Sequence, residues 1–411
     1  MLQNDRKIIR ELAKQYKELA LHDSNHERKQ RIRQTNGLVQ VRPIVWIDEI
    51  PWHEMDIDGA LKLHCEDRRF REMEDFFRKA LYRWKYIQAD MVLEDCFFVK
   101  KSYDITDIGL PISERIISSN AENHIVSHQY RDQLDTEEKI EQLKCPVITT
   151  HPEIDEQNLT FAAEVLDGIL DVKLCGDYIY YAPWDDISRY RGVEPILIDM
   201  IERPEFLHKI IAKFTEIKLS QYTQMEEKGL LEANLTALHS TPAYVDKLPS
   251  ADYDGKRARF KDVWFRGMAQ MFSTVSPAMH EEFDLQYMKP LMERCGLVYY
   301  GCCEPLDDKI QILKKIPNLR KIGVSPWAKV VSSAEQIGKD YVFARKPNPA
   351  FVADEFDEEV VRKETKETIT ACQKYGCPYE MVLKDISTVS YKPQNLIKWN
   401  RVVQETLDEF Y

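Results

Sequence analysis

The chain has 411 residues, of which 44% are hydrophobic and 31% are charged, and its formal net charge is −12. That apolar fraction can build a sizeable core, which excludes a disordered chain, and the acidic balance argues against a general nucleic-acid binder, because phosphate contacts need clustered Lys and Arg. No segment reaches the roughly 18 uncharged apolar residues of a membrane helix, and the charged N-terminus lacks the apolar core of a signal peptide. We therefore expect a cytoplasmic, globular protein.

The N-terminal residues 2–35 have the pattern of an amphipathic helix. Apolar residues such as Ile9, Leu12 and Tyr16 recur at helical spacing, and Lys, Arg and Glu occupy the other face. We expect residues 1–40 to form a helical arm that packs on the body of the same chain. Packing on a second subunit is the alternative.

Short apolar runs alternate with amphipathic stretches through the rest of the chain. The runs are 43–50, 90–99, 170–176, 235–240, 297–303, 319–326, 340–347 and 379–385. The amphipathic stretches are 64–88, 189–229, 277–295, 305–316, 332–338 and 355–375. Runs of this kind are typical of parallel strands buried on both faces.

Eight such runs separated by helices predict an α/β fold, and specifically a TIM-like (β/α)8 barrel over residues 41–411. An open, doubly wound sheet is the alternative architecture. Residues 100–165 are too many for a plain crossover between strands. They predict an insertion of helices and loops after the second strand.

In a barrel of this type, catalytic side chains gather where the strands end. Polar residues follow several of the predicted strands: Asp48, Glu49, Trp52, His239, Arg345, Lys346, Lys384 and Asp385. The carboxylates and the histidine are candidates for proton transfer, and the three cations are candidates for holding an anion. Structural roles are the alternatives, since Asp48 can cap a helix and a lone histidine on a strand is often structural.

The predicted strand 297–303 leads into the most informative residues. Because strand side chains alternate between faces, Tyr300, Cys302 and Glu304 are expected on one face. Cys303 is expected to face the helices unless the end of the strand turns it inward. Since Zn²⁺ accepts thiolate and carboxylate ligands, we predict a metal site formed by Cys302 and Glu304, with Cys303 as a third candidate. Two buried cysteines without a metal are the alternative.

Motifs in the C-terminal half resemble one known family, the uroporphyrinogen decarboxylase superfamily. They are FSTVSPAMHEEFDLQYMKPLMERCGLVYYGCCEPLDDKI, GVSPWAKV, DYVFARKPNPAFV and YGCPYEMVLKDISTVSYKPQNLIKWNRVV. The segment RPIVWIDEI resembles the first strand of the same family. The resemblance is good over about 265–411, moderate over 160–250 and thin before that, and it implies a TIM-like barrel.

The family has two classes of activity. One is cofactor-free decarboxylation of uroporphyrinogen, which uses an Arg-rich segment after the first strand. Here that place holds the acidic DEIPWHEM, which repels a substrate with many carboxylates. The other is zinc-dependent methyl transfer to or from corrinoid proteins, with His-x-Cys after the fifth strand and another Cys after the eighth. Cys302 matches the first of these cysteines, Tyr300 stands in the place of the histidine, and Lys384 or Asp385 stands near the last ligand.

The resemblance therefore implies a methyltransferase that moves a methyl group between a small methylated compound and a corrinoid protein or a thiol, with zinc as a Lewis acid. The expected metal ligands are Cys302, Glu304 and Cys303; the expected proton carriers are Asp48, Glu49, His239 and Asp385; the expected substrate contacts are Trp52, Tyr300, Arg345, Lys346 and Lys384. A homodimer is also implied. The alternatives are a lyase acting on a small carboxylic acid without a metal, and a barrel that binds a corrinoid or tetrapyrrole without turnover.

Overall fold

A computed structural model of the chain describes residues 2–117 and 127–411. Its centre is a parallel sheet of seven strands in the order β1-β15-β14-β13-β12-β11-β8. The strands are β1 (Ile44–Ile47), β8 (Ile179–Tyr181), β11 (Trp264–Gly267), β12 (Leu297–Tyr300), β13 (Leu319–Val324), β14 (Val342–Arg345) and β15 (Tyr379–Leu383). The predicted α/β class is confirmed.

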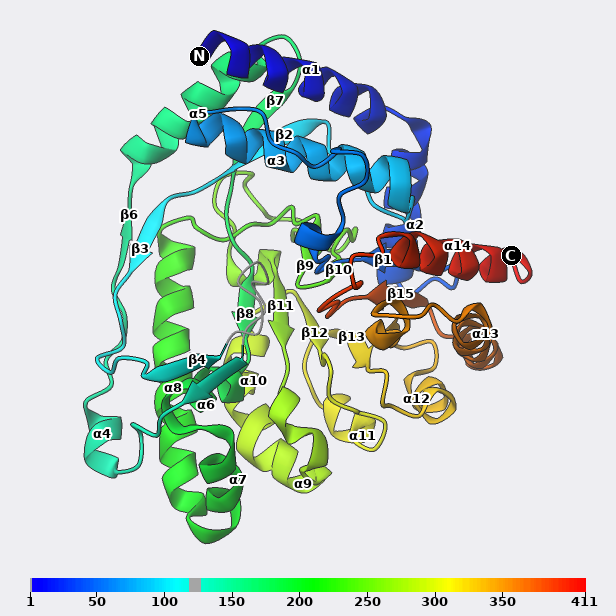
Figure 1. The fold of residues 1–411 in the computed structure, drawn as a ribbon. Coiled ribbons are helices and arrows are strands. Elements are labelled where there is room, and N and C mark those ends of the chain that lie inside the picture. The colour runs from blue at the N-terminus through cyan, green and yellow to red at the C-terminus, as the bar shows by residue number, and fades with distance from the viewer. Residues whose placement is uncertain (1, 118–126) are drawn as a thin grey trace.

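Helices follow these strands and surround the sheet (Figure 1). After β8 come α6 (Pro183–Arg191), α7 (Val193–Glu202) and α8 (Pro204–Glu227), and after β11 come α9 (Pro277–His280) and α10 (Gln286–Met292). The last four strands are followed by α11 (Ile310–Leu313), α12 (Val330–Ile337), α13 (Glu358–Tyr375) and α14 (Gln394–Asp408). Single turns of 3-10 or π-helix are η1 (Trp52–Glu54), η2 (Arg83–Ile87), η3 (Phe260–Asp262), η4 (Gln270–Thr274), η5 (Glu281–Leu285) and η6 (Pro349–Val352). None of the helices in the described part of the chain combines the length and the apolar character that crossing a bilayer demands.

Helix boundaries follow from local capping. The Asp357 side chain accepts the backbone N–H of Glu359 at 3.0 Å and so begins α13, and Gly376 ends this helix in the left-handed conformation with φ of +71°. An N-cap of this type stabilises a helix by about 1 kcal/mol, and glycine adopts positive φ without a steric penalty.

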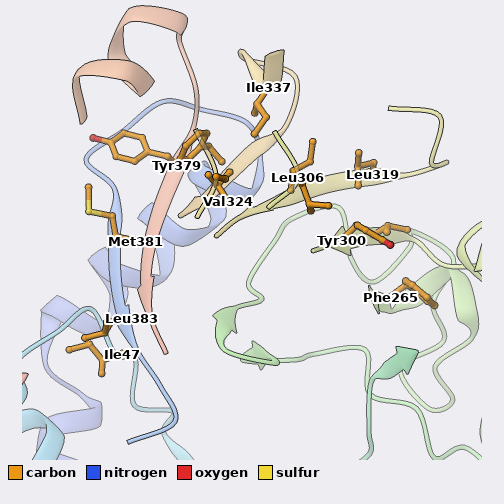
Figure 2. Packing of buried hydrophobic residues seen from close by; sticks show 14 of the residues in the cluster. Ile47, Phe265, Tyr300, Leu306, Leu319, Val324, Ile337, Tyr379, Met381 and Leu383 are labelled. Atoms are coloured by element: carbon orange, nitrogen blue, oxygen red, sulfur yellow. The ribbon is translucent and has the colours of Figure 1, made fainter. Parts of the chain in front are cut away.

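The sheet is buried on both faces, as its mostly apolar strands predict. Along β12, Val298 and Tyr300 pack in the main core between the sheet and the helices, whereas Leu297 and Tyr299 belong to a separate cluster on the inner face. Figure 2 shows Tyr300 in this main core, near Phe265. Burying each such side chain contributes about 1.5–3 kcal/mol, so the alternation fixes which side chains face inward.

A hairpin lies at the opening between the two edge strands, β1 and β8 (Figure 1). Its strands are β9 (Ala237–Leu238) and β10 (Thr241–Pro242). Lys321 Nζ, on the inner face of β13, donates to Thr241 Oγ1 at 3.1 Å and pairs with Glu380 Oε2 at 2.9 Å. The hairpin therefore reaches into the space that the curved sheet encloses. The run 235–240 belongs to this hairpin, and a closed eight-stranded barrel is not seen among the described residues.

The N-terminal arm consists of two helices, α1 (Leu2–Ala20) and α2 (Asp23–Asn36), where a single helix was expected. His22 separates them, because its Nδ1 accepts the backbone N–H of Ser24 at 3.2 Å and caps α2. α1 packs against α3 (Arg68–Tyr82) and α5 (Pro152–Leu166), and Arg10 donates to the carbonyl of Val165 at 2.9 Å. The arm thus packs on its own chain.

The segment 100–165 contains short strands that the sequence analysis misses. β3 (Tyr103–Ile105) pairs with β6 (Ile148–Thr150), and β4 (Glu114–Ile117) pairs with β5 (Ser127–Tyr130). At the two ends of the segment, β2 (Cys96–Lys100) pairs with β7 (Asp171–Cys175). One short helix, α4 (Glu137–Glu141), and most of α5 complete the described part of the segment. The expectation of helices and loops alone is wrong, because strands of three or four residues are too short to show alternation. The runs 90–99 and 170–176 do form strands, but these pair with each other outside the main sheet.

Candidate functional site

The candidate site begins at Gly301, where β12 ends. Gly301 has φ of +98°, and a Cβ there would collide with Leu306, so the turn requires glycine. This turn interrupts the strand alternation. Cys302 is fully buried among side chains that include Met268 and Tyr180.

Tyr300 lies on the opposite side of the strand from Cys302. Its hydroxyl donates to Asp284 Oδ2 at 2.6 Å and lies 2.6 Å from Nε2 of His280, both in the helical layer. The prediction that Tyr300 shares a face with Cys302 is wrong. The turn at Gly301 ends the strand, so the alternation of side chains between faces does not continue to Cys302. The structure therefore does not bring Tyr300 to the site.

A lysine lies against the buried sulfur. Lys384, directly after β15, places its Nζ 3.0 Å from Cys302 Sγ. The pKa of the Cys302 thiol is well below its ordinary value. The largest cause is a hydrogen bond from Cys303; against the opposing effect of burial, a hydrogen bond from His239 and the charges of Arg266 and Lys384 also lower it. Although burial alone lowers the pKa of Lys384, the negative charges of Cys302 and Asp385 raise it overall. The pair is therefore a thiolate and an ammonium group.

Three other polar side chains surround Lys384 Nζ. His239 Nε2 lies 3.4 Å away, Asp385 Oδ1 lies 3.2 Å away and Glu49 Oε1 lies 3.7 Å away. These residues come from the β9–β10 hairpin, the end of β15 and the end of β1. The structure thus brings together the predicted residues Glu49, His239, Lys384 and Asp385 around Cys302.

Glu49 ties the three segments to one another. Its Oε1 accepts from Ser240 Oγ at 3.0 Å, and its Oε2 accepts from the backbone N–H of Asp385 at 2.8 Å. Glu49 and Asp385 both have positive φ, 51° and 56°, a conformation that costs free energy and is concentrated at functional sites. Burial raises the pKa of Glu49, but the charge of Lys384 and the hydrogen bonds lower it overall. Asp48 Oδ1 accepts the N–H of Glu49 at 2.9 Å, so it fixes this turn.

Cys303 is partly exposed and shares its proton between two acceptors. Its Sγ lies 3.5 Å from Cys302 Sγ and 2.8 Å from Asp385 Oδ2. A thiol has a single S–H, so the proton points either to the sulfur or to the carboxylate. Burial raises the pKa of Asp385, which makes this carboxyl a ready proton acceptor or donor.

Glu304 holds the loop, because both of its carboxylate oxygens accept backbone N–H groups. Oε2 accepts from Cys302 at 3.0 Å, and Oε1 accepts from Ala269 at 3.2 Å. The side chain is buried, which raises its pKa. Glu304 therefore positions Cys302 and joins the loop after β12 to the loop after β11.

Two predicted substrate contacts lie elsewhere. Trp52 stacks edge-on against Tyr82 with ring centres 5.9 Å apart, beside α3. Arg345 donates to Glu364 on α13 at 2.7 Å. Both residues have local structural partners, and neither reaches the cluster around Cys302.

The predicted substrate contact Lys346 lies on the inner face beside Tyr299, whose surroundings the residue pattern does not predict. Lys346 Nζ donates to the Tyr299 hydroxyl, and the guanidinium carbon of Arg266 lies 4.0 Å from the centre of its ring. Burial lowers the pKa of Lys346 to about 8. Arg266 is fully buried, and its Nε and Nη2 have no hydrogen-bond partner among the described residues. A single charge inside the apolar run VWFRG is the signal that marks Arg266 in the sequence.

Asp185, in the first turn of α6, is a further missed group. Burial and then the charge of Glu304 raise the pKa of its carboxyl to about 7, and Cys302 contributes to the shift. Oδ2 of this residue accepts from Gln270, which in turn contacts the Met268 sulfur at 3.1 Å. A carboxyl with a pKa near neutral pH is suited to donating a proton.

The potential metal ligands around Cys302 are not arranged to bind zinc. Sulfur, imidazole and carboxylate are suitable ligands chemically, but the ammonium group of Lys384 lies against the Cys302 sulfur and repels a cation. Both oxygens of the expected ligand Glu304 are engaged by backbone N–H groups. Within residues 2–117 and 127–411, no group of three or more His, Cys, Asp or Glu side chains is arranged to hold a metal ion.

Comparisons with family models and with curated proteins find no match for this chain. A function is therefore inferred from the side chains around Cys302.

Proposed function

We propose that the protein is a methyltransferase in which Cys302 Sγ receives a methyl group from a small methylated compound. The observation that carries this proposal is the 3.0 Å contact between the buried Cys302 sulfur and Lys384 Nζ. The thiolate is the nucleophilic form of cysteine. An ammonium group beside it maintains that form without a separate base.

The chemistry is a displacement at the methyl carbon. The bond between this carbon and the donor's heteroatom breaks, the electron pair stays with the heteroatom, and a carbon–sulfur bond forms at Cys302. In this proposal Asp185 protonates the departing heteroatom, since its pKa of about 7 keeps part of it protonated at neutral pH. An acceptor, either a thiol or the corrinoid of a partner protein, then takes the methyl group and restores the thiolate.

Two further points support this proposal. The motifs around Cys302 resemble the methyltransferase class of the uroporphyrinogen decarboxylase superfamily, and we propose that the seven-stranded sheet is an open variant of the TIM-like barrel of that family. In both, the reactive residues follow the carboxyl ends of parallel strands. Glu49 and His239 act as positioning residues, because they hold the Lys384 ammonium at the sulfur.

Intact-mass measurement tests the proposal directly. The protein is incubated with methyl ethers, methylamines and methyl sulfides, and we expect one class of donor to add the mass of one CH₂ unit at Cys302. The Cys303→Ser variant is the matched control and keeps this gain, whereas Cys302→Ser loses it. Turnover of a methyl donor that is unchanged in Cys302→Ser would contradict the proposal.

A carboxy-lyase is the second candidate, and the buried Arg266 favours it. Its unpartnered Nε and Nη2, together with Lys346, are suited to holding a substrate carboxylate. Release of CO₂ from a small acid, lost in Arg266→Gln and retained in Cys302→Ser, would support this function over methyl transfer.

A further inference from the structure

The adjacent thiols have a second chemical capacity that methyl transfer does not use. Cys302 Sγ and Cys303 Sγ lie 3.5 Å apart, and each has a polar partner of opposite character: the ammonium of Lys384 at 3.0 Å from the first, and the carboxylate of Asp385 at 2.8 Å from the second. We propose that this pair is a redox modification site at which hydrogen peroxide oxidises the two thiols to a vicinal disulfide.

The contacts provide the two groups that the reaction requires, a nucleophilic thiolate and an acceptor for the second thiol proton. Lys384 holds Cys302 as the thiolate, the form that peroxide attacks. Asp385 Oδ2 lies 2.8 Å from Cys303 Sγ, so it can take the proton that this thiol must lose. Cys303 and Asp385 are partly exposed, which gives a small oxidant a route to the buried sulfur beside them.

The atoms and electrons balance in two steps. The Cys302 thiolate attacks one oxygen of hydrogen peroxide, the O–O bond breaks, and a sulfenic acid forms as hydroxide leaves. Cys303 transfers its proton to Asp385, and its sulfur then attacks Cys302 Sγ. The S–O bond breaks, the S–S bond forms, and the second hydroxide leaves as water with the proton from Asp385. The two sulfurs lose two electrons, which reduce the peroxide.

A second pair of cysteines, Cys372 and Cys377, lies at the end of α13 and just before β15, so at the opposite end of this strand from Lys384. Both of these cysteines are fully buried, and Cys377 Sγ donates to the backbone carbonyl of Ala334 at 3.3 Å. Neither of them is exposed to an oxidant, in contrast to the partly exposed Cys303. Oxidation at Cys302 and Cys303 also removes the thiolate, so it would switch off any reaction that needs this sulfur.

The test uses the mass of the full-length protein. After one equivalent of hydrogen peroxide, we expect the wild-type chain to lose the mass of two hydrogens, peptide mapping to locate the link between 302 and 303, and a dithiol reductant to reverse it. The Cys303→Ser variant should gain oxygen instead. Asp385→Asn should slow formation of the link by about tenfold or more, because it removes the proton acceptor.

A trivalent arsenical, phenylarsine oxide, gives an independent measurement, because it binds two convergent thiols together. We expect one arsenical per wild-type chain and none in Cys303→Ser. Oxygen addition without a 302–303 link in the wild type, or equal arsenical binding by both proteins, would overturn the proposal. Both readouts are masses of the protein itself, so the site is tested whether or not a methyl donor is found.

Discussion

The ammonium group of Lys384 lies 3.0 Å from the sulfur of Cys302, and both side chains are almost completely buried. A buried charge is costly unless it is paired, so each group requires the other. This contact joins the end of β15 to the loop after β12 and places a thiolate among Glu49, His239 and Asp385. The reactivity of the site therefore depends on a lysine that is remote in the sequence.

The ionisation of Cys302 tests this relationship. Because its pKa is lowered, the thiol should already be ionised below the pH range in which ordinary cysteines titrate. The difference in ultraviolet thiolate absorbance between the wild type and Cys302→Ser should therefore stay constant between about pH 6 and pH 8. In Lys384→Met, the pKa of Cys302 should rise by about one unit or more, since an opposite charge is lost. A thiolate signal that rises with pH through this range in the wild type would show that Cys302 is an ordinary buried thiol.

The metal content is a second prediction. The position of Lys384 and the engaged oxygens of Glu304 predict that protein prepared without chelators contains well under one zinc per chain. Chelator treatment should leave the thiolate absorbance unchanged. One zinc per wild-type chain that is lost in Cys302→Ser would contradict this, and would require Lys384 to move away from the sulfur.

The pH dependence of methyl transfer tests Asp185. A group that donates a proton acts only in its protonated form, which is present below its pKa and lost above it. Since the pKa of Asp185 is about 7, the rate should fall as the pH rises through that value. Asp185→Asn should abolish this decline and lower the rate at about pH 6 by roughly 100-fold. A profile that is the same in both proteins would remove Asp185 from the reaction.

Most strands of the main sheet can be predicted from the sequence, but the hairpin between its two edge strands cannot. Apolar runs predict β1 and β12 to β15, because strands buried on both faces are apolar at most positions, even though Lys321 and Glu380 lie within two of them. The prediction misses β8 and β11, which have three and four residues. It also places the run 235–240 in the main sheet, whereas long-range contacts such as the one between Thr241 and Lys321 hold this segment as a hairpin.

The site shows where residue patterns stop being informative. Glu49, Lys384 and Asp385 can be predicted because each follows a strand of the parallel sheet, and such positions meet at one end of the sheet. His239 also reaches the site, but it does so from the β9–β10 hairpin and not from a strand of that sheet. The face of Tyr300 is predicted wrongly because alternation holds only while the strand continues, and Gly301 ends it. Nothing in the local sequence shows that both oxygens of Glu304 are used by the backbone.

Tyr300→Phe tests the placement of this tyrosine in the helical layer. The change removes the hydroxyl that donates to Asp284 and lies beside His280, and it leaves buried polar atoms without a partner. We expect the free energy of unfolding to fall by about 1–3 kcal/mol in chemical denaturation, with no change in the thiolate absorbance of Cys302. Loss of methyl transfer at unchanged stability would instead place Tyr300 in contact with substrate.

Substitution of Glu304 distinguishes a structural role of its carboxylate from a catalytic or metal-binding role. Glu304→Gln keeps one carbonyl oxygen for the N–H of Cys302 or Ala269 but turns an amide NH₂ toward the other, so a buried N–H loses its acceptor. We expect this variant to unfold with about 1–3 kcal/mol less free energy than the wild type, and Glu304→Ala with a larger loss, because both N–H groups are then unpaired. Since the loop positions Cys302, the rate of peroxide oxidation should change along with stability in the two variants. If stability is unchanged in both while zinc binding or activity disappears, the carboxylate is a ligand or a catalytic group, and the backbone contacts are incidental.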